Sequence, residues 1–317
     1  MLTNNRERKS IRSQYGKTLV ELGKENPNIV VLDADLSCST QTAMFGKEFP
    51  ERFFNMGISE QDMMTTAVGL ATTGKIPFVS TFSMFAAGRA WDQIRNSICY
   101  PKFNVKIVAT HGGITVGEDG ASHQALEDLS IMRSIPNMMV VVPADCAETA
   151  EVIKFAAQYN GPMYIRIART NVPDVFDKET YKFNPNKAIV VSEGSDVTLI
   201  TNGETLAEAI DCVELLKEQN ISAELIHMPV IKPIDTQTIV KSAQKTNKVV
   251  TIENHSIIGA IGSAVCETLS ENYPTKVLRI GTNDEFGQSG EQRKLMEHYG
   301  LTGEKLAEKI VKFLGKN

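Results

Sequence analysis

A glutamate at the start of an apolar helical pattern, directly after a glycine turn, is the first candidate for chemistry in this chain. Residues 55–62 read N-M-G-I-S-E-Q-D and place Glu60 in the first turn of that pattern. An acid here complements the helix dipole, with Ser59 as N-cap and Asp62 approximating a capping box. Alternatively, it transfers protons. The local pattern favours the first interpretation, so the rest of the chain has to decide.

Two phenylalanines follow a predicted strand that ends near Ser80. Phe82 and Phe85, in S-T-F-S-M-F, have the spacing of core residues on one helix face. The same pair could line a slot for a flat heteroaromatic ring. Local spacing leaves both interpretations open.

A glycine-rich loop after the strand ending at Thr110 carries several polar side chains. It reads H-G-G-I-T-V-G-E-D-G-A-S-H and contains His111, Asp119 and His123. Two histidines and an acid in one loop favour a polyhydroxylated substrate. Arg169 ends the run M-Y-I-R-I-A-R, where it could form a surface salt bridge or bind a phosphate.

Short β-branched runs that alternate with helical patterns predict an α/β fold. The predicted architecture is two open, mostly parallel sheets with helices on both faces. Ligands of such sheets bind at the carboxyl ends of the strands. Residues 171–187 break the periodicity with two prolines and several charges, and we place the domains at 1–172 and 188–317 with a linker at 173–187. The predicted strands are 30–34, 77–81, 105–110, 138–142, 164–168, 197–201, 223–227, 249–253 and 277–280; the predicted helices lie at about 10–43 (interrupted by the first strand), 60–73, 84–98, 145–159, 204–219, 257–271 and 303–314.

Composition narrows the classes of partner. The 317 residues carry a net charge of -5 without any block of like charges, which argues against nucleic-acid and membrane partners. Five scattered cysteines, no apolar N-terminal core and no spanning run indicate a protein of the cytoplasm. The sequence lacks the dinucleotide, P-loop and hydrolase motifs, and its histidines are not at zinc spacing, so we expect no metal site in this chain.

Four motifs together resemble the pyrimidine-binding and C-terminal domains of transketolase. They are G-I-S-E-Q-D-M, S-T-F-S-M-F, G-E-D-G-A-S-H-Q-A-L-E-D-L and I-A-R, in the family's order. In that family thiamine diphosphate lies between two parts, one of which holds the diphosphate and Mg²⁺ through a G-D-G motif. This chain has no G-D-G. It therefore resembles the second half of a split transketolase, with the Mg²⁺ ligands on a separate N-terminal, diphosphate-binding subunit and a heterotetramer built around a dimer of this chain.

The resemblance gives the cofactor-facing residues roles. Glu60 matches the glutamate that exchanges a proton with pyrimidine N1′, and a buried carboxyl there is expected to hold its proton more readily than a solvated one. Phe82 and Phe85 match the rings around the pyrimidine, although Gly88 stands where many members have a third aromatic residue. Asp35 and Leu36 match a cofactor-facing segment.

The resemblance also implies a substrate site. His111, Asp119 and His123 match residues that contact the sugar, with His111 and His123 counted as catalytic and His123 expected to stabilise an alkoxide or carry its proton. Arg169 matches a phosphate-binding arginine, and Arg12 and Ser39 fall near further phosphate ligands. The implied reaction transfers a two-carbon ketol unit from a ketose phosphate to an aldose phosphate. The C-terminal domain is assigned to architecture and dimer contacts.

Three alternatives remain open. Deoxyxylulose-phosphate synthases share the glutamate and the D-G-x-x-H loop, but known members carry an acid in place of His111. Beta subunits of 2-oxoacid dehydrogenases have a similar length but a different loop. A non-catalytic regulatory subunit is the third, and the retention of Glu60, His111, Asp119, His123 and Arg169 argues against it.

Overall fold

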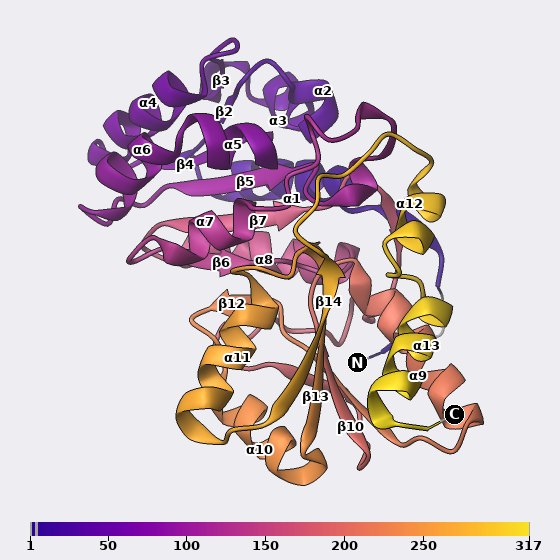
Figure 1. Cartoon of the computed structure of the whole chain (residues 1–317). Helices are drawn as coiled ribbons and strands as arrows, with labels where there is room; N and C mark the ends of the chain where they lie inside the picture. Colours follow the sequence, from indigo (N-terminus) through magenta and orange to yellow (C-terminus); the bar gives the residue numbers. More distant parts are fainter. Residues whose placement is uncertain (1, 4–5, 317) are drawn as a thin grey trace.

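Two layered α/β units make up the chain, whose computed structural model describes residues 2–3 and 6–316 (Figure 1). The first unit is built on a seven-stranded sheet of order β12-β6-β7-β5-β4-β2-β3. All neighbouring strands are parallel except β12, which is antiparallel to β6. The strands are β2 (Ile29–Asp33), β3 (Phe53–Asn55), β4 (Ile76–Phe82), β5 (Lys106–Thr110), β6 (Met139–Val141), β7 (Met163–Ile167) and β12 (Val230–Lys232).

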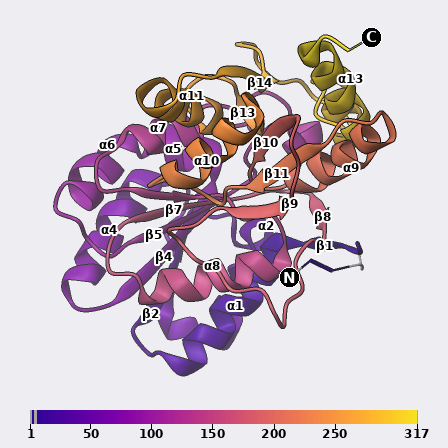
Figure 2. The same ribbon diagram turned by 90° about the horizontal axis from the view of Figure 1, so that it is seen from below.

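Helices cover both faces of this sheet, because its central strands are apolar on both sides. Helices α1 and α8 pack on one face, and α4, α5 and α7 pack on the other (Figure 2). The helices are α1 (Ile11–Glu25), α2 (Ser37–Thr40), α3 (Ala43–Glu48), α4 (Glu60–Thr72), α5 (Ser83–Arg89), α6 (Trp91–Gln93), α7 (Asp128–Ser134) and α8 (Cys146–Gln158); the 3-10 segments η1 (Pro50–Arg52) and η3 (Ile114–Asp119) and the π-helical turn η2 (Ile94–Cys99) complete the unit.

The second unit repeats this arrangement with a five-stranded sheet of order β14-β13-β10-β11-β9. Only the edge strand β9 is antiparallel. Helices α10 and α11 pack on one face, and α9 and α13 on the other. The elements are β9 (Ile189–Ser192), β10 (Val197–Thr201), β11 (Ala223–His227), β13 (Lys248–Ser256), β14 (Lys276–Thr282), α9 (Thr205–Glu218), α10 (Thr236–Thr246), α11 (Ile261–Asn272), α12 (Gln292–His298) and α13 (Gly303–Leu314).

The two units are joined by more than the covalent chain. Strand β12 follows β11 in sequence but pairs with β6 of the first sheet. One continuous apolar cluster contains residues of both sheets, such as Ala109, Ile200 and Ile226. Strand β1 (Arg8–Ser10) also pairs antiparallel with β8 (Asn171–Pro173) as a separate two-stranded sheet. The two sheets are therefore fixed against each other.

The fold class predicted from the sequence is confirmed, and several details differ. The short strands β3 and β12 were not predicted, because three residues carry too little periodicity. Strand β8 extends into the segment predicted as a linker, and the helix predicted at 84–98 is divided into α5, α6 and η2. The helix predicted to start at residue 257 begins at Ile261, since β13 and a turn occupy the preceding residues.

No helix in the described part of the chain is long and apolar enough to cross a membrane.

Candidate active site

The carboxyl ends of the parallel strands β2, β4, β5 and β7 lie at one edge of the first sheet. Asp35, Phe82, His111 and Arg169 each stand at or just after one of these ends. Because the strands are parallel and in register, residues far apart in sequence meet here. The predicted site residues are therefore gathered along one edge.

Glu60 is the first residue of α4 and is buried, with 3% of its surface exposed. Its Oε1 accepts a hydrogen bond of 2.8 Å from Nη1 of Arg89, whose side chain is half exposed. Ser59, the residue before the helix, makes no capping hydrogen bond with its side chain. The capping-box interpretation is therefore wrong for this helix, and the buried carboxyl faces a cation at the open side of the site.

An aromatic group lies beside this carboxyl, formed by Phe82, Phe85, His111 and His123. The rings of Phe82 and His111 stack with centroids 3.8 Å apart, and Phe82 and Phe85 are 5.8 Å apart. His123 lies at the edge of the group. Its ring plane is inclined by 72° to that of Phe85, and the two ring centroids are 5.4 Å apart. Phe82 is buried and Phe85 is partly exposed, so the group presents an open apolar surface.

The flat guanidinium of Arg89 already occupies this surface, and its contacts indicate which flat heteroaromatic groups could bind there. It lies 4.2 Å from the Phe85 ring centroid and donates to Glu60 at the same time. A flat, nitrogen-containing group can thus lie over Phe85 while it bonds the buried carboxyl, and the resemblance to transketolase implies the same two kinds of contact for an aminopyrimidine. Glu60, Phe82 and Phe85 would hold that part of thiamine diphosphate.

His111 is held in an unusual backbone conformation, with φ at 61°. Its Nδ1 is 2.8 Å from Oγ1 of Thr110. Burial, together with the positive charges of Arg12, Arg169 and His123, lowers the pKa of His111 to about 3. His111 is therefore a neutral hydrogen-bonding group at ordinary pH.

The other loop residues are more accessible. His123 is partly exposed, and its Nδ1 lies 2.9 Å from Oγ of Ser122. Asp119 is exposed at the end of η3. Both remain available to a ligand that enters beside the aromatic group.

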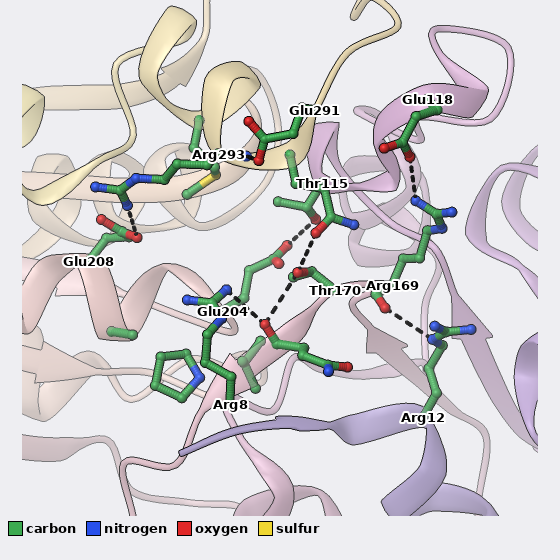
Figure 3. Close-up of a pocket in the computed structure, with 16 residues that line it drawn as sticks. Arg8, Arg12, Thr115, Glu118, Arg169, Thr170, Glu204, Glu208, Glu291 and Arg293 are labelled. Atoms are coloured by element: carbon green, nitrogen blue, oxygen red, sulfur yellow. Dashed lines mark hydrogen bonds and ion pairs between the residues drawn. The ribbon is translucent and has the colours of Figure 1, made fainter. Parts of the chain in front are cut away.

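Two arginines meet next to this loop (Figure 3). Arg12 donates from Nε to the carbonyl of Arg169 over 3.1 Å and from Nη1 to the carbonyl of Ser39 over 2.6 Å. Arg169 donates from Nη1 to the carbonyl of Val116 and to Oε2 of Glu118, at 2.6 and 2.9 Å. Burial and the nearby Arg169 lower the pKa of Arg12, so an anion between them would relieve unfavourable charge.

These arginines line a cavity of about 680 Å³ that reaches the second unit. Figure 3 shows Arg12, Arg169 and Glu118 at one end, Glu208 of α9 and Arg293 of α12 at the other, and Glu204, the residue before α9, between them. At the far end carboxylates outnumber Arg293, which pairs with Glu208 at 2.6 Å and with Glu304 at 3.3 Å. At the near end two arginines lie beside one paired carboxylate, Glu118. The end with Arg12 and Arg169 is the better anion site.

Asp35 and Leu36 lie on the β2–β3 side of the same edge. Asp35 has φ at 63° and accepts a 3.0 Å hydrogen bond from Nδ2 of Asn55. The buried Asp33 shapes this turn: its Oδ1 accepts from the backbone N–H of Leu36 and its Oδ2 accepts from Oγ1 of Thr40. Asp35 contacts Asn55, and the backbone of Leu36 contacts Asp33. The role of Asp35 and Leu36 at the cofactor stays a prediction.

Sequence reasoning missed several residues at this edge. Arg89 and Asn55 belong to first-unit segments that carry other motif residues, but nothing in their own spacing marks them. Glu204, Asn254 and Gln292 come from the second unit, and their hydrogen bonds reach Thr115, Ile114 and Thr170. A sequence signal for such contacts does not exist in one chain, because the partners lie from 89 to 140 residues apart.

Metal binding has no candidate here: within residues 2–3 and 6–316, no group of three or more His, Cys, Asp or Glu side chains could hold an ion.

The fold defines an α/β protein with two mostly parallel sheets, and comparison with known proteins gives the family, whose members generally use thiamine diphosphate. Residues 7–175 match the pyrimidine-binding domain of transketolase, and residues 186–306 match the transketolase C-terminal domain. The chain belongs to the transketolase family and corresponds to its C-terminal half.

Relatives of similar length show more specifically which members of the family the chain resembles. The chain is 54% identical to a putative transketolase C-terminal section of Methanocaldococcus jannaschii over 310 residues, which is 97% of both chains. It is 39% identical to the 6-deoxy-6-sulfo-D-fructose transketolase subunit SqwH of a Clostridium species, over 93% of this chain and 92% of that one. A solved split-gene transketolase, described as an inactive beta4 tetramer, is 54% identical with a TM-score of 0.90 and covers 96% of this chain and 98% of that one.

Proposed function

We propose that this chain is the pyrimidine-binding subunit of a split, thiamine diphosphate-dependent transketolase, which transfers a two-carbon ketol unit from a ketose phosphate to an aldose phosphate. The observation that carries the proposal is the buried Glu60 beside the Phe82 and Phe85 rings, within one site with His111, His123 and the Arg12–Arg169 pair. Relatives of the same length that are named as transketolase sections or subunits support it.

When bound, thiamine diphosphate supplies the nucleophilic carbon to which the two-carbon unit is attached. Glu60 would bond pyrimidine N1′ and hold or move a proton there, which would require Arg89 to release or share the carboxyl group. Phe82 and Phe85 orient the ring, and Asp35 and Leu36 border it. Exclusion of water by these rings strengthens the hydrogen bond to Glu60.

The sugar is held by the loop and the arginines. His111, neutral because of its low pKa, bonds a substrate oxygen without adding charge. His123 donates a proton to, and removes one from, the oxygen on which negative charge develops, and Asp119 binds a hydroxyl group. Arg12 and Arg169 hold the phosphate. Arg12 also fixes the segment around Ser39 by donating to the Ser39 carbonyl.

The diphosphate and Mg²⁺ would be bound by a separate N-terminal subunit, with two copies of each chain forming a heterotetramer in the cytoplasm. Exposed apolar side chains at the rim of the site support the proposal of a protein partner. Ile58, two residues before Glu60, is 74% exposed, and Met84 and Trp91 are also exposed. Large apolar side chains around a site that lacks the diphosphate ligands are consistent with a surface that a partner covers.

The test is two-carbon transfer from xylulose 5-phosphate to ribose 5-phosphate with thiamine diphosphate and Mg²⁺. This chain, the co-encoded diphosphate-binding chain and their mixture are assayed separately. Activity in the mixture alone is expected. A mixture that instead condenses pyruvate with glyceraldehyde 3-phosphate would favour the synthase, and one that binds cofactor without any transfer would favour a regulatory subunit.

A further inference from the structure

The loop that carries the three predicted sugar-binding residues rests on the second unit. Gly113, with φ at 79°, lies so close to β13 that a Cβ atom there would be 2.4 Å from the side chain of Asn254. At Gly112 a Cβ atom would lie 1.8 Å from Nε of Arg166. The start of the loop is thus pressed against two polar side chains, and only glycine permits this approach.

Asn254 makes the central contacts of this interface. It is only 4% exposed, and its Oδ1 accepts a 2.9 Å hydrogen bond from the backbone N–H of Ile114. Its Nδ2 donates to Oγ1 of Thr115 over 3.1 Å and to Oε1 of Glu204 over 2.5 Å. One buried amide thus connects β13, the start of α9 and the first two residues of η3.

Further bonds determine how this amide is oriented. The Thr115 hydroxyl donates to the same Glu204 oxygen over 2.8 Å, and Nη2 of Arg166 fixes the main chain at this residue by donating to the backbone carbonyl of Asn254 over 2.8 Å. The amide must point its oxygen at Ile114 and its nitrogen at Glu204, because only that orientation matches donors with acceptors. An amide is the side chain that meets both demands.

The loop connects the Asn254 contacts to the two parts of the substrate site, the His111 side and the Arg169 side. His111 lies three residues before Ile114, and the carbonyl of Val116, two residues after it, accepts from Arg169. A shift of the Ile114–Val116 backbone would therefore move the contact of Arg169 and the histidine together. Glu204 and Thr115 also line the cavity that contains Arg12 and Arg169 (Figure 3).

We propose that Asn254 is a positioning residue for substrate binding, through which the second unit fixes the loop that carries His111, Asp119 and His123. The proposal rests on the proposed function of that loop. It gives the second unit a part in the site in addition to architecture, while the residues proposed to face the cofactor lie on elements of the first unit: Glu60 on α4, Phe82 at the end of β4 and Phe85 on α5.

The first test is Asn254→Ala in the complete two-chain complex. Since misplacement of a binding group by about 1 Å can cost up to roughly 100-fold in rate, kcat/KM for the sugar phosphate is expected to fall roughly 10- to 100-fold. The dissociation constant for thiamine diphosphate should change less than kcat/KM, because Glu60, Phe82 and Phe85 lie on other elements and only the Phe82 ring stacks on His111 of the loop. Equal losses in cofactor and sugar binding, or no loss in either, would overturn the proposal.

A matched control is Asn272→Ala at the end of α11. It removes an amide from the same unit, one that donates to the Thr268 carbonyl over 2.8 Å within its own helix, and should leave the kinetics unchanged. If Asn272→Ala lowers kcat/KM as much as Asn254→Ala, the loss reflects general destabilisation and the proposal fails.

A rescue experiment tests the orientation of the amide. Asn254→Asp keeps the acceptor for Ile114 but places a second carboxylate against Glu204, and it should impair sugar use. Adding Glu204→Gln restores a donor between the two side chains and should recover most of the activity lost in Asn254→Asp. Failure of the double variant to recover would contradict the assigned hydrogen bonds.

Hydrogen exchange separates this inference from the proposed function. In Asn254→Ala, amides in residues 113–116 should exchange roughly 10-fold faster than in the unaltered chain, and those of α4 should not change. A wild-type complex without ketol transfer would refute the proposed function, and the exchange result would still decide whether Asn254 holds the loop. Unchanged exchange at residues 113–116 would refute the positioning role.

Discussion

The two units of this chain share an architecture, but they use the carboxyl ends of their strands differently. In the first unit, Phe82 ends β4, and His111 and Arg169 follow β5 and β7; their side chains line the cavity or belong to the aromatic group. In the second unit, Asn202 follows β10 and Asn254 lies near the end of β13; both are buried, and the side chain of Asn254 is bonded to protein atoms. The same edge of a parallel sheet can therefore form a ligand site or support one that is formed elsewhere.

The difference arises from what covers each edge. The second unit's strand ends face the first unit, so that several of their polar groups bond to protein atoms. Asn254 bonds the loop after β5, and His227 lies 2.7 Å from Oε2 of Glu148 on α8. The first unit's strand ends near α4 and α5 retain half-exposed partners such as Arg89. Its edge is therefore the one that can exchange protein contacts for a ligand.

The largest effect is expected at the open edge, from Glu60→Ala. Turnover in the two-chain complex should fall about 100-fold or more, as is usual when a proton-transfer residue is lost. Folding should be preserved, because the bond that is lost goes to the half-exposed Arg89. Steady-state kinetics and thermal melting measure the two quantities, with Glu51→Ala, an exposed acid on η1, as the control. Near-normal turnover would remove Glu60 from the mechanism.

At the covered interface, Glu148→Ala should have the opposite effect and lower stability rather than turnover. This fully buried carboxylate accepts hydrogen bonds from Tyr181, His227 and the backbone N–H of Ala144, which would all lose their partner. The free energy of unfolding should fall by about 2 kcal/mol or more, because each unsatisfied buried group costs roughly 1–3 kcal/mol. Denaturant titration measures this loss. If the main loss is in kcat at unchanged stability, the contrast between the two edges does not hold.

Arg169→Ala should have an intermediate effect at the cavity. The KM for phosphorylated sugars should rise roughly 10-fold or more, since hydrogen bonds to charged groups contribute about 1.5–3 kcal/mol. Arg293→Ala is the matched control, because Arg293 lines the same cavity but is paired with Glu208 and Glu304. Equal losses on unphosphorylated acceptors, or an equal loss in the control, would argue against a phosphate at Arg169.

The smallest effect concerns pH. A histidine with a pKa near its ordinary value of about 6.5 is mostly charged at pH 5. The pKa of His111 is lowered to about 3, so it is already neutral there. Between pH 5 and 9 the pH profile of kcat/KM should therefore keep its shape in His111→Gln, even if the values fall. Loss of an ionisation near pH 6 in this variant would show that His111 titrates in that range.

Much of the first unit could be predicted because its elements are long and periodic. The buried run 105–110 and the polar loop after it are adjacent in sequence, so a strand and its ligand-facing loop could be placed without tertiary information. The positions of Glu60, His111 and Arg169 at one edge followed from the rule for parallel sheets. The aromatic group of Phe82, Phe85, His111 and His123 followed only in part, since stacking depends on rotamers.

The remainder depended on contacts between distant segments. Strand β12 was missed because three residues between turns have no period, and it joins a sheet formed mainly by residues 29–167. The prediction that the second unit supplies architecture and dimer contacts did not include the bonds of Asn254 and Glu204 to the loop after β5, because a buried amide has no sequence signature. The predicted domain boundaries remain a prediction.

The sequence by itself determined the types of side chain at the strand ends and the order of α/β elements, because periodicity and glycine turns are local properties. Only the tertiary structure decided which of those side chains meet. Arg89 reaches Glu60, Arg12 reaches Arg169, and Asn254 reaches Ile114 because packing two apolar sheets into one core brings separate chain segments within hydrogen-bond distance. That packing depends on all parts of the chain at once, and no short segment of the sequence contains it.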